Sequence, residues 1–365
     1  MEVCFNWIVW NICFYLAYTG FRKDPYHSCK VQSGIYKKLI FFMSLYALFT
    51  FFGGDIKRDK EFVEQGGYIA ANLNLFNSMD DIYIIFAQYS FGQLVIWKAL
   101  VYLPCIYFAI QTFKRLNRFN YSTLLFFILF FQVSIGSTRG VLGYSIYLYG
   151  LSLTVSRSNV TTLIGHIVII STFFLHNQML VPIMLYYLSY IPLNRKRIIV
   201  LLVSIPIIIT FVNFILIPYL ETDEMFRASR LGFKYQSYIE NEDIEFLTSI
   251  PQKLYTTLTY IVVGLSFLWS LKAEIYKSIP IVYLRIIRIC FYLIYIFLIL
   301  SNIDILNIDV VAGRYFSMTT FFIFIIIPII FENKLISKNK YNFLIKLAAF
   351  KVNLFFAWML WNEIS

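Results

Sequence analysis

Hydrophobic residues gather in long runs along the whole chain, and short polar segments separate these runs. Runs of roughly 20 residues recur, which is the length that a helix needs to cross the hydrocarbon core of a bilayer. The pattern predicts an all-α polytopic membrane protein with about twelve transmembrane helices in one transmembrane domain, residues 1–365. The runs lie at about 3–21, 39–54, 83–113, 121–136, 140–155, 160–175, 178–192, 198–220, 254–271, 281–301, 315–331 and 342–361.

The composition agrees with a membrane protein and excludes a set of ordinary soluble domains. Hydrophobic residues make up 59% of the chain and charged residues only 14%, whereas a soluble domain carries about 25% charged residues. The net charge is +11, which would indicate nucleic-acid binding in a soluble chain. In a membrane protein the same excess first indicates which loops face the cytoplasm, so we expect no nucleic-acid partner.

The basic residues are divided unevenly between the loops on the two sides of the predicted membrane. One alternate set of loops holds 17 Lys and Arg residues, and the other set holds 9. Cytoplasmic loops carry the excess of Lys and Arg, so the second set and the N-terminus are predicted to face outward. The two longest loops, about 55–82 and 221–253, belong to this outer set. Because long loops are often functional, we expect the chemistry on the outer face.

Four of the arginines in or beside the outer loops are candidate binding residues, because these loops hold few basic residues. The planar guanidinium group offers several donors that suit phosphate oxygens, so arginines that converge near the membrane surface could hold a pyrophosphate headgroup. The alternative for each arginine is a structural role, in which the side chain extends to the membrane–water interface or forms an ion pair with an acidic residue of an outer loop. The four residues are Arg139, Arg227, Arg230 and Arg314.

Three glycines recur on one side of a predicted helix, at positions Gly136, Gly140 and Gly143. Small residues let a neighbouring helix approach closely, and such a crossing would fix the position of Arg139 in the same segment. Tyr144 follows the glycines and could stack on the face of a sugar. Aromatic residues alone are weak evidence, because the chain contains 28 Tyr and 38 Phe.

Two residues are candidates for a base that accepts a proton during group transfer. His176 lies at the outer end of a hydrophobic run, and the pKa of a histidine lies near neutrality. Asp55 begins the first outer loop, where a carboxylate could face a reacting group at the membrane surface. A single histidine in a helix is more often structural, so the base stays open. Metal-binding and nucleotide-binding motifs are missing from the sequence, and we expect neither a metal nor a cofactor.

Between Gly136 and Tyr187 the chain has an arginine, a helix, a short basic turn and a second helix that ends in histidine. This order resembles the EpsG/Wzy-type polysaccharide polymerases. Arg139 and Leu175-His176 occupy the places of the family's arginine and histidine. Gly140 stands where the family usually has Gln, and Leu175 where it usually has Phe.

Two further segments resemble the same family. Gly54-Asp55 is similar to the Gly-x-Asp-Tyr of the first outer loop, although the tyrosines expected after the aspartate are missing. Gly313-Arg314-Tyr315-Phe316 is similar to the pattern of arginine and aromatic residues that opens a late span. The resemblance therefore extends over most of the chain in layout, but only over these short segments in residues.

The resemblance implies a GT-C-like polymerase architecture in the bacterial inner membrane, with the active site facing the periplasm. Such enzymes join oligosaccharide repeat units that are carried on undecaprenyl pyrophosphate. Both donor and acceptor are lipid-linked glycans, and the product is O-antigen or a related surface polysaccharide. These polymerases usually work with a repeat-unit flippase and a chain-length regulator.

On this hypothesis, Arg139 and Arg314 hold the donor pyrophosphate and stabilise the charge that develops as it leaves. His176 or Asp55 accepts the proton from the attacking sugar hydroxyl, and the match to the family favours His176 slightly. Four further residues complete the expected substrate site: Arg227, Arg230, Tyr315 and Tyr144.

Two other classes of protein remain open. A flippase or transporter of lipid-linked oligosaccharides would also need cationic sites, but these should line a central path that is reachable from both sides. An O-antigen ligase, or another lipid-carrier glycosyltransferase, would share the outer-face chemistry, and the sequence barely separates it from a polymerase. Few basic residues lie within the predicted spans: Lys98, Arg285, Arg288, Lys346 and Lys351.

Overall fold

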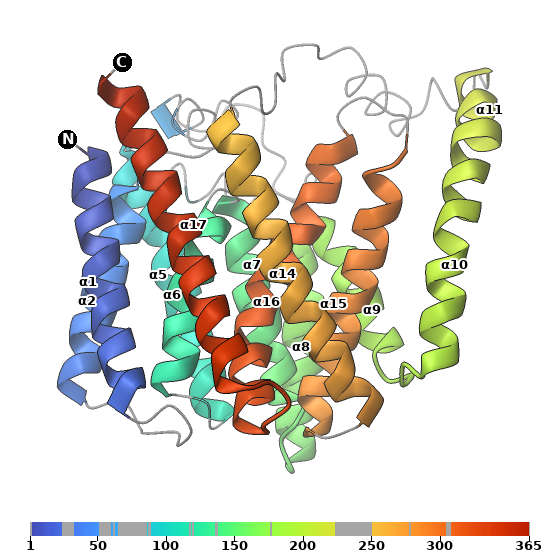
Figure 1. The fold of residues 1–365 in the computed structure, drawn as a ribbon, viewed down its shortest axis with the longest axis horizontal. Coiled ribbons are helices and arrows are strands. Elements are labelled where there is room, and N and C mark those ends of the chain that lie inside the picture. Colours follow the sequence, from blue (N-terminus) through green and yellow to red (C-terminus); the bar gives the residue numbers. More distant parts are fainter. Residues whose placement is uncertain are drawn as a thin grey trace.

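The computed structural model of the chain is a bundle of helices (Figure 1). The expected all-α fold class is confirmed for the residues that the structure describes. These are residues 2–23, 33–50, 60, 63–64, 86, 89–116, 118, 120–135, 138–175, 177–222, 250–276, 279–303 and 308–364.

A helix overlaps each of the twelve predicted hydrophobic runs. Two short irregular turns of helix, the 3-10 turn η1 (Asn177–Met179) and the π-helical turn η2 (Val212–Leu216), adjoin α9 and α10. The α-helices are α1 (Glu2–Lys23), α2 (Ser33–Phe49), α5 (Leu94–Arg115), α6 (Tyr121–Ile135), α7 (Thr138–Leu153), α8 (Asn159–Leu175), α9 (Leu180–Leu188), α10 (Arg195–Phe211), α11 (Ile217–Thr222), α14 (Ile250–Tyr276), α15 (Ile281–Leu300), α16 (Ile308–Glu332) and α17 (Lys338–Ile364).

Several of these helices are long and apolar enough to cross a membrane by themselves, so the chain is a polytopic helical membrane protein. The last hydrophobic run, which contains Lys346 and Lys351, is among them as α17. The full number of twelve crossings stays a prediction. Within the described residues five segments meet the criterion: Leu94–Arg115, Arg195–Tyr219, Leu254–Tyr276, Ile281–Leu300 and Lys338–Trp361.

A bend divides α16, which is a sixth candidate span. The segments Ala312–Ile323 and Ile325–Glu332 meet at an angle of 41°. Pro328 lies inside this helix, four residues after Phe324 at the bend. Proline has no N–H for the carbonyl four residues earlier, and its ring crowds that carbonyl, so Pro328 explains the bend.

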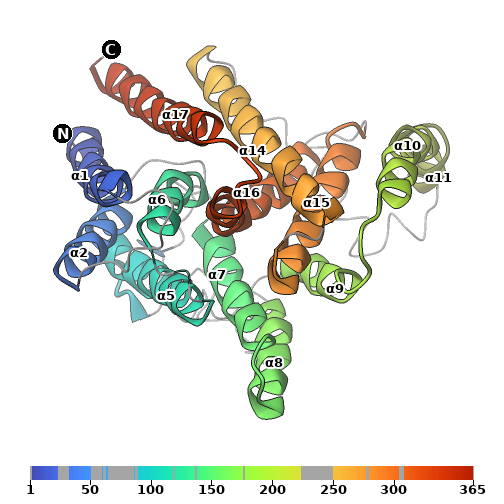
Figure 2. The same ribbon diagram turned by 60° about the horizontal axis from the view of Figure 1, so that its bottom comes forward.

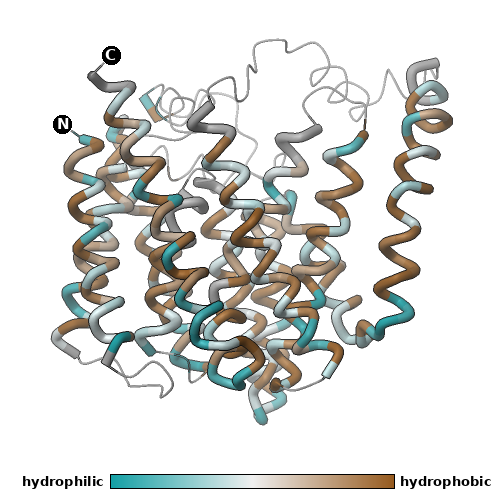
Figure 3. The backbone as a smooth tube through the Cα atoms, viewed as in Figure 1, coloured by the Kyte–Doolittle hydropathy of each residue, from teal (hydrophilic) through white to brown (hydrophobic). Residues whose placement is uncertain are grey.

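Polar residues collect at the two ends of the bundle, and the helices between them are hydrophobic (Figure 3). At one end α1 begins and α17 ends, and we call it the terminal end (Figure 1). The opposite end, which we call the basic end, carries charged residues at helix termini or in the short connections between helices, among them Arg115, Arg157, Arg195 and Lys338. The positive-inside rule predicts that the basic end faces the cytoplasm.

The helix α16 lies in the middle of the bundle, with other helices on all sides (Figure 2). It packs against α6, α7, α14 and α15, and most of its described side chains between Ala312 and Phe331 are buried. A helix that is hydrophobic on every face belongs in the interior. The run of Phe and Ile residues in α16 therefore explains its central position.

The helix α9 is much shorter than its predicted run, 178–192. Its 9 residues extend over about 14 Å, whereas the hydrocarbon core is about 30 Å thick. α9 therefore cannot cross the core alone. Its end is fixed by hydrogen bonds to side chains of other helices: the Ser189 carbonyl accepts from Arg288, and the Leu193 N–H donates to Glu274.

The helices α10 and α11, with η2 between them, stand at the edge of the bundle (Figure 2). Two hydrogen bonds attach this segment to the α15 region. The hydroxyl groups of Ser204 and Tyr295 lie 2.7 Å apart, and the Asn213 amide donates to the Asn302 carbonyl at 3.1 Å. Most apolar side chains of α10 are exposed, as expected for a helix that faces lipid on most sides.

The helices α7 and α8 approach each other closely at two glycines. A Cβ atom on Gly165 would lie 2.8 Å from the Gly150 carbonyl oxygen and 2.8 Å from the Thr154 backbone nitrogen. The series of glycines predicted at Gly136, Gly140 and Gly143 thus continues at Gly150, about two helical turns after Gly143. Gly143 itself faces η1, since a Cβ there would lie 3.3 Å from the Met179 sulfur.

The variant Gly165→Ala is expected to lower the stability of the protein by about 1–3 kcal/mol, because the new methyl group must push two helix backbones apart. Gly264→Ala in α14 is the matched control, since nothing lies within 4 Å of its Cβ position. Alanine favours a helix over glycine by about 1 kcal/mol, so the control should be unchanged or slightly more stable. Thermal unfolding in detergent measures both, and equal melting temperatures would contradict the close approach of α7 and α8.

Candidate functional site

The structure describes the side chains of three of the eight residues predicted for the site. Tyr144 lies in α7, and Arg314 and Tyr315 lie in α16. Arg139 is the second residue of α7, but its side chain lies outside the described part. Four further predicted residues lie outside the described residues: His176, Asp55, Arg227 and Arg230.

The structure brings two predicted residues, Tyr144 and Arg314, together. The Tyr144 hydroxyl lies 3.4 Å from the Arg314 carbonyl oxygen, to which it donates a long hydrogen bond. Each residue is six positions after the first residue of its helix, which is about 9 Å along the axis. Both helices run from the terminal end towards the basic end, so α7 and α16 are parallel (Figure 1).

The parallel direction of α7 and α16 has an electrostatic consequence at the terminal end. A helix N-terminus carries a partial positive charge of about half an elementary charge. Two neighbouring helices that run in parallel place both positive ends together, and such ends favour anionic ligands. Arg139 stands in the first turn of α7, so this end of the helix pair also carries an arginine.

Aromatic rings surround the turn of α16 that contains Arg314. The ring centroid of Phe316 lies 4.7 Å from that of Tyr260 in α14 and 5.0 Å from that of Phe297 in α15. Arg314 itself is half-buried, whereas Tyr315 is buried. The sequence did not single out Tyr260 or Phe297, because no spacing distinguishes them among so many aromatic residues.

The two tyrosines predicted to contact substrate are packed between helices. Tyr144 is 2% exposed and Tyr315 is 9% exposed. The Tyr144 ring lies against Phe321 and Phe322 of α16, at centroid distances of 6.0 and 6.5 Å. In this arrangement Tyr144 holds α7 against α16. Stacking of Tyr144 on a sugar stays a prediction, and it would require the two helices to move apart.

The helix α7 also contacts η1 and α9, on the other side of the site. Gly143 packs against Met179 of η1, as described above. The Tyr147 hydroxyl donates a hydrogen bond of 2.8 Å to the Pro182 carbonyl of α9. These contacts fix the position of η1 and α9 relative to α7.

These contacts bear on whether Arg139 and His176 belong to one site, as the sequence predicts. The neighbours of His176 are Leu175, the last residue of α8, and Asn177, the first residue of η1. The helix α8 packs against α7, and Met179 of η1 lies beside Gly143 of α7. Arg139 is the second residue of α7. The segments that flank His176 and the helix that carries Arg139 are therefore neighbours in the fold.

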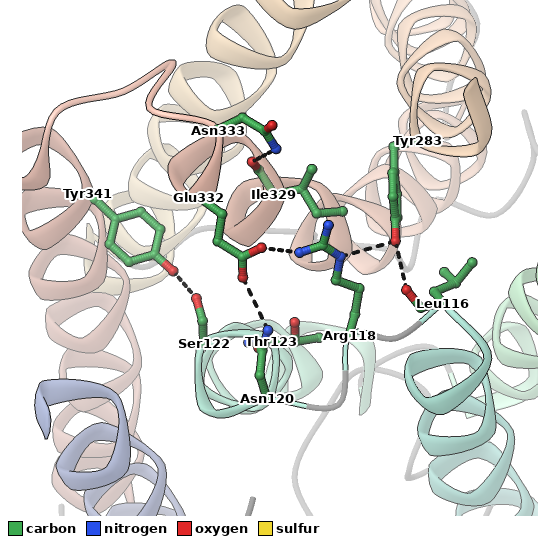
Figure 4. Close-up of polar contacts among 10 residues, drawn as sticks. All are labelled: Leu116, Arg118, Asn120, Ser122, Thr123, Tyr283, Ile329, Glu332, Asn333 and Tyr341. Carbon is green, nitrogen blue, oxygen red and sulfur yellow. Dashed lines mark hydrogen bonds and ion pairs between the residues drawn. The ribbon is translucent and has the colours of Figure 1, made fainter. Parts of the chain in front are cut away.

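A second polar cluster lies at the basic end of the bundle (Figure 4). Arg118 forms an ion pair with Glu332, and its Nε donates to the Tyr283 hydroxyl at 3.2 Å. Burial alone would lower the pKa of the Arg118 guanidinium, but Tyr283 and Glu332 beside it raise that pKa overall. The Tyr283 hydroxyl donates in turn to the Leu116 carbonyl at 3.1 Å. The cluster joins the segment between α5 and α6 to α15 and α16.

The same cluster caps the N-terminus of α6 and links α6 to α17 (Figure 4). The Asn120 amide donates to Glu332 at 3.1 Å, and its oxygen accepts from the Thr123 N–H at 2.8 Å, which is a helix N-cap. The hydroxyl groups of Ser122 and Tyr341 are hydrogen-bonded to each other. This arrangement is structural, and nothing in the spacing of the sequence predicted it.

Within the described residues, no group of three or more His, Cys, Asp or Glu side chains could hold a metal ion. Comparison with known proteins finds no relative: no family model matches the chain, and neither a curated protein nor a solved structure matches it. The family assignment therefore stays a prediction that rests on the short segments quoted above.

Proposed function

We propose that this protein is a bacterial inner-membrane polymerase. It joins undecaprenyl-pyrophosphate-linked oligosaccharide repeat units by glycosyl transfer at the periplasmic face, and so makes O-antigen or a related surface polysaccharide. The observation that carries the proposal is the 3.4 Å contact between the Tyr144 hydroxyl and the Arg314 carbonyl. This contact supports the proposal because it joins α7, whose second residue is Arg139, to α16, which contains Arg314.

The proposed reaction needs a site for the leaving pyrophosphate. A hydroxyl oxygen of the acceptor sugar forms a bond to the anomeric carbon of the donor glycan, and the bond from that carbon to the pyrophosphate breaks. The pyrophosphate leaves with the electron pair, and Arg139 and Arg314 neutralise its charge. His176 or Asp55 accepts the hydroxyl proton. The donor is already activated by its pyrophosphate, so no further cofactor is required.

The proposal includes the membrane arrangement and the partners of the enzyme. All twelve hydrophobic runs cross or enter the membrane in a GT-C-like architecture, with the loops 55–82 and 221–253 in the periplasm. Arg227 and Arg230 of the second loop then contact the acceptor carrier or the glycan. A repeat-unit flippase supplies the substrate, and a chain-length regulator limits the product.

Two of the five basic residues within the hydrophobic runs, Arg285 and Arg288, favour an enzyme over a flippase. Arg288 already forms an ion pair with Glu274, with 2.7 Å between Nε and Oε1. The Arg285 guanidinium lies 3.9 Å from the centre of the Tyr190 ring. Cations that are engaged by the protein itself do not line an open path for an anionic headgroup, which a flippase would need.

Deletion of the gene for this chain is expected to remove the ladder of long surface polysaccharide, because repeat units are no longer joined. A gel of lipopolysaccharide should then show lipid A-core with a single repeat unit, or a capsule without its ladder. Loss of a flippase would leave no repeat unit on the core, and loss of a ligase would leave long polymer on the lipid carrier. Complementation with the wild-type gene is the control, and a persistent ladder in the deletion strain would refute the polymerase.

A further inference from the structure

A cavity of about 640 Å³ lies at the basic end, between α5, α7 and α15. Its polar lining residues are Arg115 and Arg118 together with the hydroxyl-bearing residues Ser152, Ser156 and Tyr283. Apolar side chains complete the wall, and no acidic residue of the described chain lines it. The cavity lies far along the bundle from the α7–α16 contact at the terminal end.

The two arginines of the cavity differ in what they bind within the protein. Arg118 belongs to the cluster with Glu332 and Tyr283, which holds its guanidinium in place. Arg115 is the last residue of α5 and is exposed, and among the described residues no acid forms an ion pair with it. The cavity therefore has one fixed guanidinium and one that is available to a ligand.

The N-terminus of α15 adds positive potential to the same cavity. Pro280, which lines the cavity, immediately precedes this helix of 20 residues, and no side chain caps it. A helix leaves its first N–H groups without helical partners, and its dipole is positive at this end. An anion in the cavity would thus interact with Arg115 and with the end of a helix. Arg118 could add its remaining N–H donors, but Glu332 already balances its charge.

From these features we propose that the cavity binds a phosphate group. The phosphate comes from the headgroup of an anionic phospholipid or from a soluble phosphate compound, and both share the same chemistry at Arg115 and at the end of α15. Basic pockets between membrane helices at the cytoplasmic side characteristically hold anionic headgroups. Val155 and Val282 beside the polar groups suit the apolar part of a lipid. The proposal does not depend on the polymerase, because the cavity and the proposed active site lie at opposite ends of the bundle.

The test compares the binding of phosphatidylglycerol and phosphatidylcholine to the purified full-length protein by native mass spectrometry. The wild type is expected to retain phosphatidylglycerol in preference. Arg115→Gln should weaken this binding about tenfold, as the loss of one hydrogen-bonded charge implies. Arg157→Gln is the matched control, since Arg157 is an exposed arginine of the same end that does not line the cavity. Melting temperatures without added lipid verify that both variants fold.

Inorganic phosphate and glycerol 3-phosphate identify the source of the ligand. If millimolar concentrations of either compound raise the melting temperature of the wild type but not of Arg115→Gln, the site takes a soluble phosphate. If only phosphatidylglycerol does so, the site takes a lipid headgroup. Equal binding of the two lipids to the wild type, with no effect of soluble phosphate, overturns the proposal. Equal losses in Arg115→Gln and Arg157→Gln also overturn it, because they would indicate a general surface charge effect.

Discussion

Replacing Arg139, Arg314 or His176 with alanine is expected to abolish the polysaccharide ladder while the protein still accumulates in the membrane. The arginines are proposed to neutralise the leaving pyrophosphate, and loss of one donor to a developing charge lowers a rate by about 10²–10³-fold. A ladder requires many successive transfers, so a loss of this size leaves almost no long chains. Complementation of the deletion strain, followed by a gel and an immunoblot of the membrane fraction, measures both outcomes.

Two control variants separate the chemistry of these residues from their charge and from general damage. Arg314→Lys keeps the positive charge but loses the planar fork, so we expect short ladders and not complete loss. Arg157→Ala removes an exposed arginine at the basic end and should leave the ladder unchanged. Normal ladders from Arg139→Ala and Arg314→Ala would remove both residues from the proposed site, even if the deletion strain lacks the ladder.

The positions of the helices could be predicted from the sequence because hydrophobic length is a local property. Each run overlaps a helix, and the central helix α16 is also the one with the densest series of Phe and Ile. The end of α9 could not be predicted. The groups that end it, Glu274 and Arg288, are 81 and 99 residues away from the backbone atoms that they bind. No pattern within the run at 178–192 indicates these partners.

The candidate site could be predicted only as a set of residues at one end of the bundle. Arg139 and Arg314 stood out because the outer loops hold few basic residues. Hydropathy predicts where each helix lies along the chain, but it does not predict which helices pack against each other. The packing of α7 against α16 could therefore not be predicted. The contact between Tyr144 and the Arg314 carbonyl joins residues 170 positions apart, and it became visible only in the fold.

The ion pair between Glu274 and Arg288 replaces a backbone hydrogen bond at the end of α9. In a continuing helix the Ser189 carbonyl would accept from the Leu193 N–H, four residues later. Instead, the Ser189 carbonyl accepts from Arg288 at 2.8 Å, and the Leu193 N–H donates to Glu274 at 3.1 Å. The side chains of Arg288 and Glu274 are only 3% and 0% exposed. The pair thus satisfies two buried backbone groups, and each buried charge has the other as its counter-charge.

The variant Glu274→Ala is expected to lower the free energy of unfolding by about 3–5 kcal/mol, because it leaves a buried guanidinium without its counter-charge. The Leu193 N–H loses its acceptor in the same variant. Titration of the reconstituted protein with SDS measures the free energy. Lys346→Ala, which removes an exposed charge from α17, is a control that should change stability little.

The double variant Glu274→Leu/Arg288→Met tests whether the loss arises from the unpaired charge. Replacing a buried ion pair by apolar residues of similar volume is often nearly neutral, so the double variant should be more stable than Glu274→Ala. Its recovery should be incomplete, because the Ser189 carbonyl and the Leu193 N–H lose their side-chain partners. They cannot easily bond to each other, since Pro192 between them opposes a further turn of helix. A double variant less stable than Glu274→Ala would show that the backbone hydrogen bonds, and not the buried charge, dominate the energy of this pair.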